Sequence, residues 1–316
     1  MLSLGVDYEA GRWKLAAWNE DRAVDLLDFE SEAGVWDSVE DMLAAHPAAP
    51  IVLPSGFGVP VTRAGELMDR DIAEITLRRE AHRTDPLGQF LAEARRRPLR
   101  AFCIPAVRSL PSIPLHRKLN RIDLGTADVV CAAAWAIHCL AREERAYTAS
   151  NFLLLHLGAA TRALIAIQEG RIVDGIGRSD EGMGAASRAD TNGLMASLGR
   201  GVGRSRDAGE VKSIEARLRE ARSQAFWETL EKESASLLAF HGLSRVIVTG
   251  PGYPKAIQAI GARLPVEPLP TLVDGYEAAL GAALIAAGLT GGPTTELVEC
   301  LGLRQARERV LDWVLS

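Results

Sequence analysis

The opening segment alternates short apolar runs with polar breaks, and this pattern predicts three β-strands before the first helix. Residues 2–8 (LSLGVDY) form an apolar run that ends close to an aspartate, and after an Ala-Gly turn a second run covers residues 12–20 (RWKLAAWNE). Residues 22–31 (RAVDLLDFES) resemble a third strand. A helical pattern follows at residues 37–46, and residues 49–56 (APIVLPSG) predict a fourth strand.

The second half of the chain repeats this order of elements with little sequence identity between the two copies. Three short apolar strands are again followed by helices that alternate with a strand, at residues 152–157, 161–168, 171–176, 210–241, 244–250 and 274–288. A repeated pattern of this kind predicts an α/β protein made of two related domains in tandem. We expect a mixed sheet of five strands in each domain.

An alanine-rich helix separates the two copies and suggests where the domains meet. Residues 127–140 carry few charges, so this helix should be buried on most sides and packed against the small-residue helix near the C-terminus. The polar link that follows it places the domain boundary near residue 147, giving domains at 1–147 and 148–316. We expect insertions of solvated helices at about 56–108 and of a loop and helix at about 178–241.

Composition narrows the class of protein. The chain has 316 residues with 47% hydrophobic residues, and 41 acidic against 36 basic residues give a net charge of −5, which argues against nucleic acid as the main partner. We find no signal-peptide pattern and no uncharged apolar stretch of the roughly 18 residues that a membrane helix needs. We therefore expect a cytoplasmic protein without a membrane partner, compatible with a homodimer.

The four cysteines and six histidines do not form a recognisable metal or disulfide pattern. Cys103, Cys131, Cys139 and Cys300 contain no CxxC pair, and the histidines are scattered along the chain. Buried thiols that act as small apolar side chains explain the cysteines.

The segment at 152–177 (FLLLHLGAATRALIAIQEGRIVDGIG) combines a strand meander with an unusual turn. One interpretation is purely structural, because Glu169-Gly170 is a tight-turn signal between two of the strands. The first turn is different, since Gly158, Ala159 and Ala160 have almost no side chains and Thr161 adds a hydroxyl. Small residues let backbone N–H groups approach an anion, so a phosphate-binding hairpin is the second interpretation.

Five short motifs, taken in order, carry a resemblance to a known superfamily. They are LGVDYEAGRWKLA at 4–16, RIDLGTADVVCAAAWAI at 121–137, LHLGAATRALIAIQEGRIVDGIG at 155–177, VIVTGPGYPKAI at 246–257 and DGYEAALGAALIA at 274–286. The chain resembles the acetate and sugar kinase, heat-shock chaperone ATPase and actin superfamily, and within it is most similar to the group of predicted butyrate kinases. The resemblance implies two ribonuclease-H-like domains in tandem with an ATP cleft between them.

The resemblance also implies roles for particular residues, with ATP and Mg²⁺ as cofactors. Asp7 takes the place of the catalytic or magnesium-associated carboxylate, and magnesium prefers such oxygen ligands. Asp128, a further candidate catalytic carboxylate, and Gly281 mark the two connecting helices. The expected nucleotide contacts are Gly158, Ala159, Ala160, Thr161, Gly250, Pro251, Gly252, Tyr253 and Gly281. An ordinary turn carboxylate is the alternative for Asp7.

The sequence departs from the superfamily pattern at two places where the resemblance implies catalytic or phosphate-binding residues. Tyr8, Glu9 and Ala10 follow Asp7, where relatives have a glycine and a hydroxyl residue, and His156 stands where relatives have an acidic residue. His156 is therefore either a catalytic base or hydrogen-bond donor, or an inward-facing strand residue with a satisfied ring.

The resemblance implies an ATP-dependent small-molecule kinase, with a short-chain carboxylate such as butyrate as the favoured acceptor. Arg117, Asn120 and Arg121 are candidates to receive that carboxylate, although a solvated basic turn explains them as well. Two alternatives stay open: a non-catalytic nucleotide sensor or scaffold of the same fold, and an ATPase that activates a partner enzyme.

Overall fold

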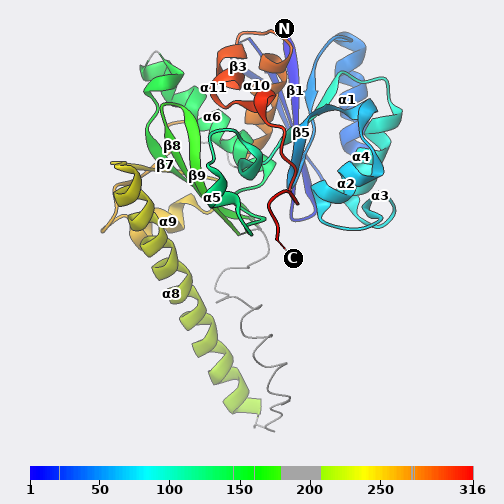
Figure 1. The fold of residues 1–316 in the computed structure, drawn as a ribbon. Coiled ribbons are helices and arrows are strands. Elements are labelled where there is room, and N and C mark those ends of the chain that lie inside the picture. The colour runs from blue at the N-terminus through cyan, green and yellow to red at the C-terminus, as the bar shows by residue number, and fades with distance from the viewer. Residues whose placement is uncertain are drawn as a thin grey trace.

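Two mixed β-sheets with helices between and around them make up the chain, as the computed structural model shows (Figure 1). The structure describes residues 1–20, 22–144, 146–159, 161–178, 208–271, 273 and 275–315.

The first sheet has the strand order β3-β2-β1-β4-β6-β5. Its strands are β1 (Leu2–Glu9), β2 (Arg12–Asn19), β3 (Arg22–Phe29), β4 (Ile51–Val52), β5 (Gly58–Arg63) and β6 (Ala101–Pro105). β1, β2 and β3 form an antiparallel meander, while β4 runs parallel to both β1 and β6. The expectation of five strands is wrong for this sheet, because β5 adds a sixth strand antiparallel to β6.

The second sheet repeats the first without the additional strand. Its order is β11-β10-β7-β8-β9, built from β7 (Phe152–Leu157), β8 (Arg162–Gln168), β9 (Arg171–Arg178), β10 (Val246–Thr249) and β11 (Val266–Pro268). β7, β8 and β9 are antiparallel, and β10 is parallel to both β7 and β11. The shared five-strand order confirms the repeat that the hydrophobic pattern predicts.

The helices of the described residues fall into three groups around these sheets. They are α1 (Glu32–Ala45), α2 (Asp69–Thr76), α3 (Ala81–Thr84), α4 (Pro86–Arg96), α5 (Leu115–Lys118), α6 (Ala127–Glu144), α8 (Ala208–His241), α9 (Tyr253–Ile260), α10 (Glu277–Leu289) and α11 (Thr295–Cys300), with short 3₁₀ turns η1 (Ala64–Glu66), η2 (Val107–Ser109), η3 (Tyr147–Ala149) and η4 (Leu303–Gln305). α1, α2 and α4 share a core with the outer face of the first sheet, and α8 and α9 share one with the second sheet. α6 and α10 share a core with both sheets.

The insertion expected at 56–108 is only partly helical. It holds α2, α3 and α4, but also β5 and the sheet strand β6. The arginines around residues 95–100 are typical of solvent-exposed helices, and this leads to the expectation that the whole segment is exposed. The apolar run AFCIP at Ala101–Pro105 is nevertheless buried at every position, as a strand inside a sheet must be.

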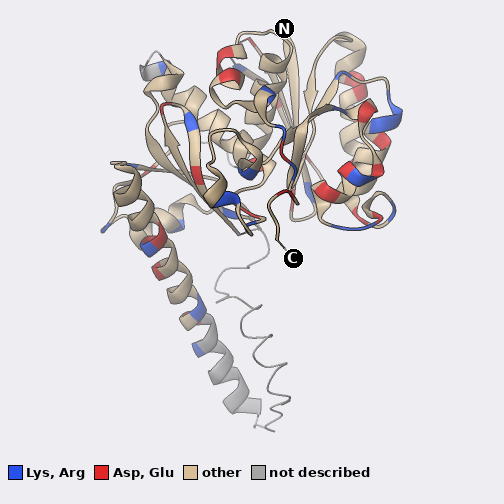
Figure 2. Cartoon of the chain, viewed as in Figure 1, with Lys and Arg blue, Asp and Glu red and all other residues tan. Residues whose placement is uncertain are grey.

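Charged side chains of both signs are mixed over α1 to α4 (Figure 2). Arg97 illustrates the mixing, because its Nε lies 3.0 Å from Glu93 Oε1 and its guanidinium lies over the Trp36 ring. Among the described residues, no helix combines the length and the apolar character that crossing a bilayer requires.

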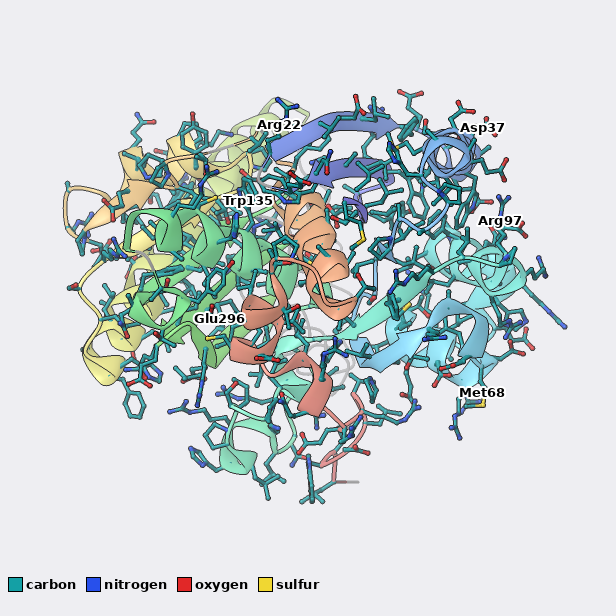
Figure 3. The ribbon with its side chains drawn as sticks, turned by 90° about the horizontal axis from the view of Figure 1, so that it is seen from above. Arg22, Asp37, Met68, Arg97, Trp135 and Glu296 are labelled. Atoms are coloured by element: carbon teal, nitrogen blue, oxygen red, sulfur yellow. The ribbon has the colours of Figure 1, made fainter. Side chains whose placement is uncertain are left out.

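α6 and α10 lie side by side between the two sheets (Figure 3) and are separated by little more than their backbones. A Cβ placed on Gly281 of α10 would lie 1.7 Å from the carbonyl oxygen of Cys131 on α6. On the opposite face of α10, a Cβ on Gly5 of β1 would lie 2.0 Å from the carbonyl oxygen of Ala279. The expected packing of the two small-residue helices is therefore confirmed, and two glycines permit it.

We predict that Gly281→Ala lowers the free energy of unfolding by about 3 kcal/mol, because the added methyl group forces two buried helices apart. Chemical denaturation monitored by circular dichroism measures the change. Gly65→Ala is the matched control, since a Cβ at Gly65 meets no atom within 4 Å. Equal stability of the two variants would contradict the packing described here.

Candidate active site

A small cavity beside β1 and the start of α6 brings two predicted carboxylates together. Its volume is about 40 Å³, and its lining combines polar groups with apolar side chains: Val6, Asp7, Tyr8, Leu53, Pro54, Ser55, Gly56, Leu87, Ile104, Ala127, Asp128, Cys131 and Ala278. Asp7 comes from the first sheet, whereas Asp128 lies in the first turn of α6. The fold therefore places on one cavity wall two acids that are far apart in sequence.

Asp7 is held in an environment that disfavours its ionised form. Its side chain is only 7% exposed. Burial raises the pKa of Asp7 to about 8, with further contributions from the negative charges of Asp128 and Glu9, while Lys14 acts in the opposite direction. A carboxyl with a pKa near neutrality can hold or release a proton under physiological conditions, as a general acid or base must.

Asp128 is half-buried, whereas Asp7 is buried, and more groups offset the effect of burial on the Asp128 carboxylate. Burial raises the pKa of Asp128, and the charge of Glu9 adds to this effect. The neighbouring His156 and a hydrogen bond from Thr126 lower it again. Its position in the first turn of α6 also favours a negative charge through the helix dipole.

His156 faces this cluster from the second sheet. It lies on β7 opposite Thr249 of β10, and its Nδ1 is 3.0 Å from the Thr249 hydroxyl. The ring is 5% exposed. His156 has a hydrogen-bond partner in Thr249 and also lowers the pKa of Asp128. It can therefore be a satisfied strand residue and a catalytic group at the same time.

The β1–β2 and β7–β8 hairpins meet through Glu9 and Thr161. Oε1 of Glu9 accepts hydrogen bonds from the backbone N–H of Thr161 at 3.0 Å and from its hydroxyl at 2.6 Å. The turn itself is closed by the N–H of Gly158, which donates to the carbonyl of Thr161 at 3.0 Å. The two predicted phosphate motifs are therefore in direct contact.

The Gly-Pro-Gly turn packs on the end of β7, next to this hairpin. Gly250 has φ +83°, and a Cβ there would lie 2.3 Å from the carbonyl oxygen of Leu157. A Cβ on Gly252 would lie 2.7 Å from Leu157 Cβ. Tyr253 follows as the first residue of α9. These glycines thus have a packing role in addition to any contact with a nucleotide.

Lys14 connects the first hairpin to the segment beside the Gly-Pro-Gly turn. Its Nζ donates to the carbonyl of Gly275 at 2.6 Å, and Gly275 in turn lies next to Pro251. Lys14 also stands opposite Asp7 in the β1–β2 register. The sequence contains a signal for this pair, because a two-residue turn at Ala10-Gly11 sets positions 7 and 14 opposite each other.

The remaining nucleotide candidates lie in different surroundings. Ala159 is exposed at the tip of the β7–β8 hairpin, and Ala160 lies outside the described residues. Gly281 is buried against Cys131, where it serves the contact between α6 and α10.

The three candidate substrate residues make structural contacts and do not line the cavity at Asp7. Arg117 lies 3.4 Å from Asp174 and over the ring of Phe240. Asn120 accepts a hydrogen bond from the N–H of Leu315, and the carbonyl of Arg121 accepts one from the buried Arg108. Arg117 joins α5 to β9, and Asn120 contacts the C-terminal segment; a role for these residues in substrate binding stays a prediction.

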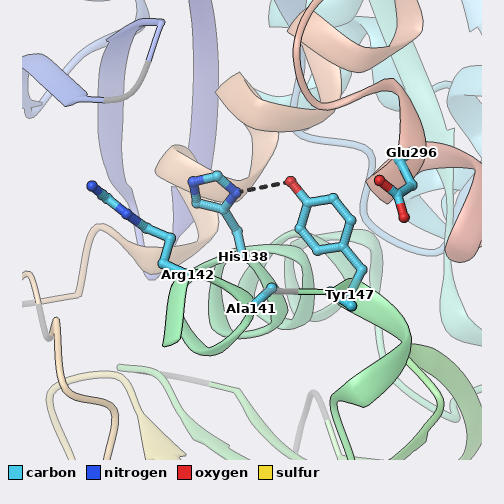
Figure 4. A pocket seen from close by; sticks show the side chains of 6 residues that line it. His138, Ala141, Arg142, Tyr147 and Glu296 are labelled. Atoms are coloured by element: carbon cyan, nitrogen blue, oxygen red, sulfur yellow. Dashed lines mark hydrogen bonds between the residues drawn. The ribbon is translucent and has the colours of Figure 1, made fainter. Parts of the chain in front are cut away.

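A second pocket lies at the end of α6, away from the paired carboxylates. It has a volume of about 310 Å³ and is lined by His138, Ala141, Arg142, Ala146, Tyr147 and Glu296 (Figure 4). Nδ1 of His138 is 3.1 Å from the Tyr147 hydroxyl. Burial, assisted by the charge of Arg142, lowers the pKa of His138 to about 4, so the ring is neutral near pH 7.

The strand order, the paired hairpins and the intervening helices form a fold that solved kinase structures share. Acetate kinase from Entamoeba histolytica superposes with a TM-score of 0.54 at 12% identity, covering 83% of this chain and 86% of that one. A propionate kinase from Francisella tularensis subsp. tularensis SCHU S4 gives 0.53 at 12% identity, covering 89% and 98%.

Within that fold the chain belongs to the family described as "Protein of unknown function (DUF1464)", whose model matches residues 30–316. No curated protein matches the chain.

We predict that Asp7→Asn raises the free energy of unfolding by up to about 5 kcal/mol at pH 8 in the presence of a chelator. Between the pKa of an unfolded aspartate and about 8, the folded protein keeps the Asp7 proton that the unfolded chain releases, so wild-type stability falls as pH rises. Below pH 4 the two proteins should be equally stable.

Urea unfolding at pH 4, 6 and 8 measures this difference. The exposed Asp37 (Figure 3) supplies the control variant Asp37→Asn, for which we expect no pH-dependent gain. A difference between Asp7→Asn and wild type that stays constant from pH 4 to 8 would show that Asp7 titrates normally.

Proposed function

We propose that this chain is an ATP-dependent phosphotransferase acting on a small molecule, with the nucleotide bound between its two domains. The contact of the two hairpins through Glu9 and Thr161, beside the acids Asp7 and Asp128 that line the cavity, is the observation that carries the proposal. Phosphoryl transfer depends mainly on positioning and on stabilising charge, and this arrangement supplies groups for both tasks.

The phosphate groups would be held from the second domain. The turn from Gly158 to Thr161 presents a backbone N–H and a hydroxyl that already bind a carboxylate. Gly250, Pro251 and Gly252 would pass under the base or ribose, since a turn without large side chains lets a flat group approach the backbone.

Asp7 and Asp128 fit a role in binding Mg²⁺ together with the phosphates. The described residues contain no group of three or more His, Cys, Asp or Glu side chains arranged to hold a metal by themselves. This fits magnesium, which usually takes one or two carboxylates and completes its shell with phosphate and water. The ion would neutralise charge that develops on the transferred phosphoryl group.

Asp7, Asp128 and His156 supply the proton chemistry. With a hydroxyl acceptor such as a sugar, ionised Asp7 would accept the hydroxyl proton, whereas a carboxylate acceptor has no proton to remove. His156 acts on Asp128 electrostatically and would favour its ionised form. These roles need no group beyond those that line or face the cavity.

A short-chain carboxylate such as butyrate is the favoured acceptor because of the family resemblance. The neighbouring apolar side chains Leu53, Leu87 and Ile104 line the cavity beside Asp7 and offer contacts to a short alkyl group.

A nucleotide-binding sensor without turnover is the second candidate. Glu9 and His156 favour it, because each stands at a position where active relatives have a different residue type.

We predict that Asp7→Asn lowers kcat by at least about 100-fold and changes the dissociation constant of ATP by less than about fivefold, since the carboxylate acts mainly in the transition state. Product formation with acetate, propionate, butyrate and a panel of sugars measures the first, and calorimetry with ATP and Mg²⁺ the second. Asp37→Asn should behave as wild type. Wild-type protein that binds ATP but phosphorylates none of these acceptors would support the sensor instead.

A further inference from the structure

Glu9 binds the donors that a phosphate group would need. Its carboxylate comes from the first domain and accepts from both the N–H and the hydroxyl of Thr161 in the second. A backbone N–H and a hydroxyl on a small-residue turn form the kind of concave donor set that binds anions. Bonds of this type to a charged oxygen are short and strong.

The carboxylate is also seated tightly against the turn. A Cβ placed on Gly158 would lie 2.1 Å from Glu9 Oε1 and 2.5 Å from the Thr161 hydroxyl oxygen. Only a residue without a side chain leaves room for Glu9 here. A phosphate oxygen that used the Thr161 donors would have to occupy the space that Glu9 Oε1 fills.

The charges around Glu9 add to this competition. Glu9 raises the pKa values of both Asp7 and Asp128, so three acids are close enough to repel one another. Lys14 offsets part of this charge at Asp7, but its Nζ donates to the carbonyl of Gly275. An incoming polyphosphate therefore meets negative charge where the two hairpins join.

We propose that Glu9 is a built-in competitor for the phosphate subsite, and that it makes nucleotide binding conditional on a divalent cation. A phosphate group displaces Glu9 from Thr161, and the cation offsets the repulsion between the displaced carboxylate and the phosphates. This inference rests on the proposed function, because it concerns the same nucleotide site. It assigns Glu9 a role in ligand selectivity, whereas the resemblance assigns none to that position.

The test compares wild type with Glu9→Gln, which keeps the side-chain shape and removes its charge. Calorimetric titration with ATP and with inorganic pyrophosphate is carried out in Mg²⁺ and in excess chelator. In chelator, we expect Glu9→Gln to bind ATP at least about tenfold more tightly than wild type does. This is the effect expected when a charged carboxylate no longer competes with phosphate for one hydrogen bond. In Mg²⁺ the gain should be smaller.

Two further variants separate competition from a structural effect. Glu66→Gln removes an exposed glutamate elsewhere in the first domain and should leave the affinity unchanged. Thr161→Val removes the hydroxyl donor that Glu9 and phosphate would share, so adding Glu9→Gln to this variant should raise the ATP affinity in chelator by less than about tenfold. Glu9→Gln should also lower the melting temperature without ligand, because a contact between the hairpins is weakened.

The outcomes distinguish this inference from the proposed function. Wild type that binds ATP while Glu9→Gln binds it equally well or more weakly in chelator overturns the role of Glu9 alone. If neither protein binds ATP in either medium, both proposals fail. ATP binding by Glu9→Gln where wild type binds none in chelator supports both.

Discussion

The close contact of α10 with both β1 and α6 is the constraint on which the rest of the structure depends. Gly5 lets β1 reach α10, and Gly281 lets α10 reach Cys131 on α6. Asp7 follows Gly5 on the same strand, and Asp128 precedes Cys131 by one helical turn. Because both acids are attached to elements locked by these contacts, their proximity follows from helix packing and not from any attraction between them.

That packing imposes an electrostatic cost at the centre of the protein. Asp7 is buried, Asp128 is half-buried beside it, and both have raised pKa values, in part because Asp128 repels the charge of Asp7. Ionisable side chains that destabilise the folded state and line a cavity are typical of functional sites. The second domain contributes the partial compensation, through His156 beside Asp128. The first sheet and α6 supply the acids, and His156 of the second sheet lowers the pKa of Asp128.

Several features of the site could be read from local patterns. The Ala10-Gly11 turn sets Lys14 opposite Asp7, and a small-residue turn after β7 indicates an anion-binding hairpin. Other features could not. Arg117 lies in a basic segment that suggests substrate binding, yet Asp174 and Phe240 from distant elements contact it in the structure. Neighbours in sequence reveal a residue's chemistry but not its long-range partners.

The sequence by itself determined most of the strands and helices and the repeat of one α/β pattern. These follow from hydrophobic periodicity and turn chemistry, which act over a few residues. The resemblance to a kinase-like superfamily rests instead on five short motifs in order. Only the tertiary structure decided that β6 is a sheet strand, that Asp7 and Asp128 share a cavity, and that Glu9 binds Thr161. Each of these depends on which surfaces pack together across the chain, and local spacing carries no information about that.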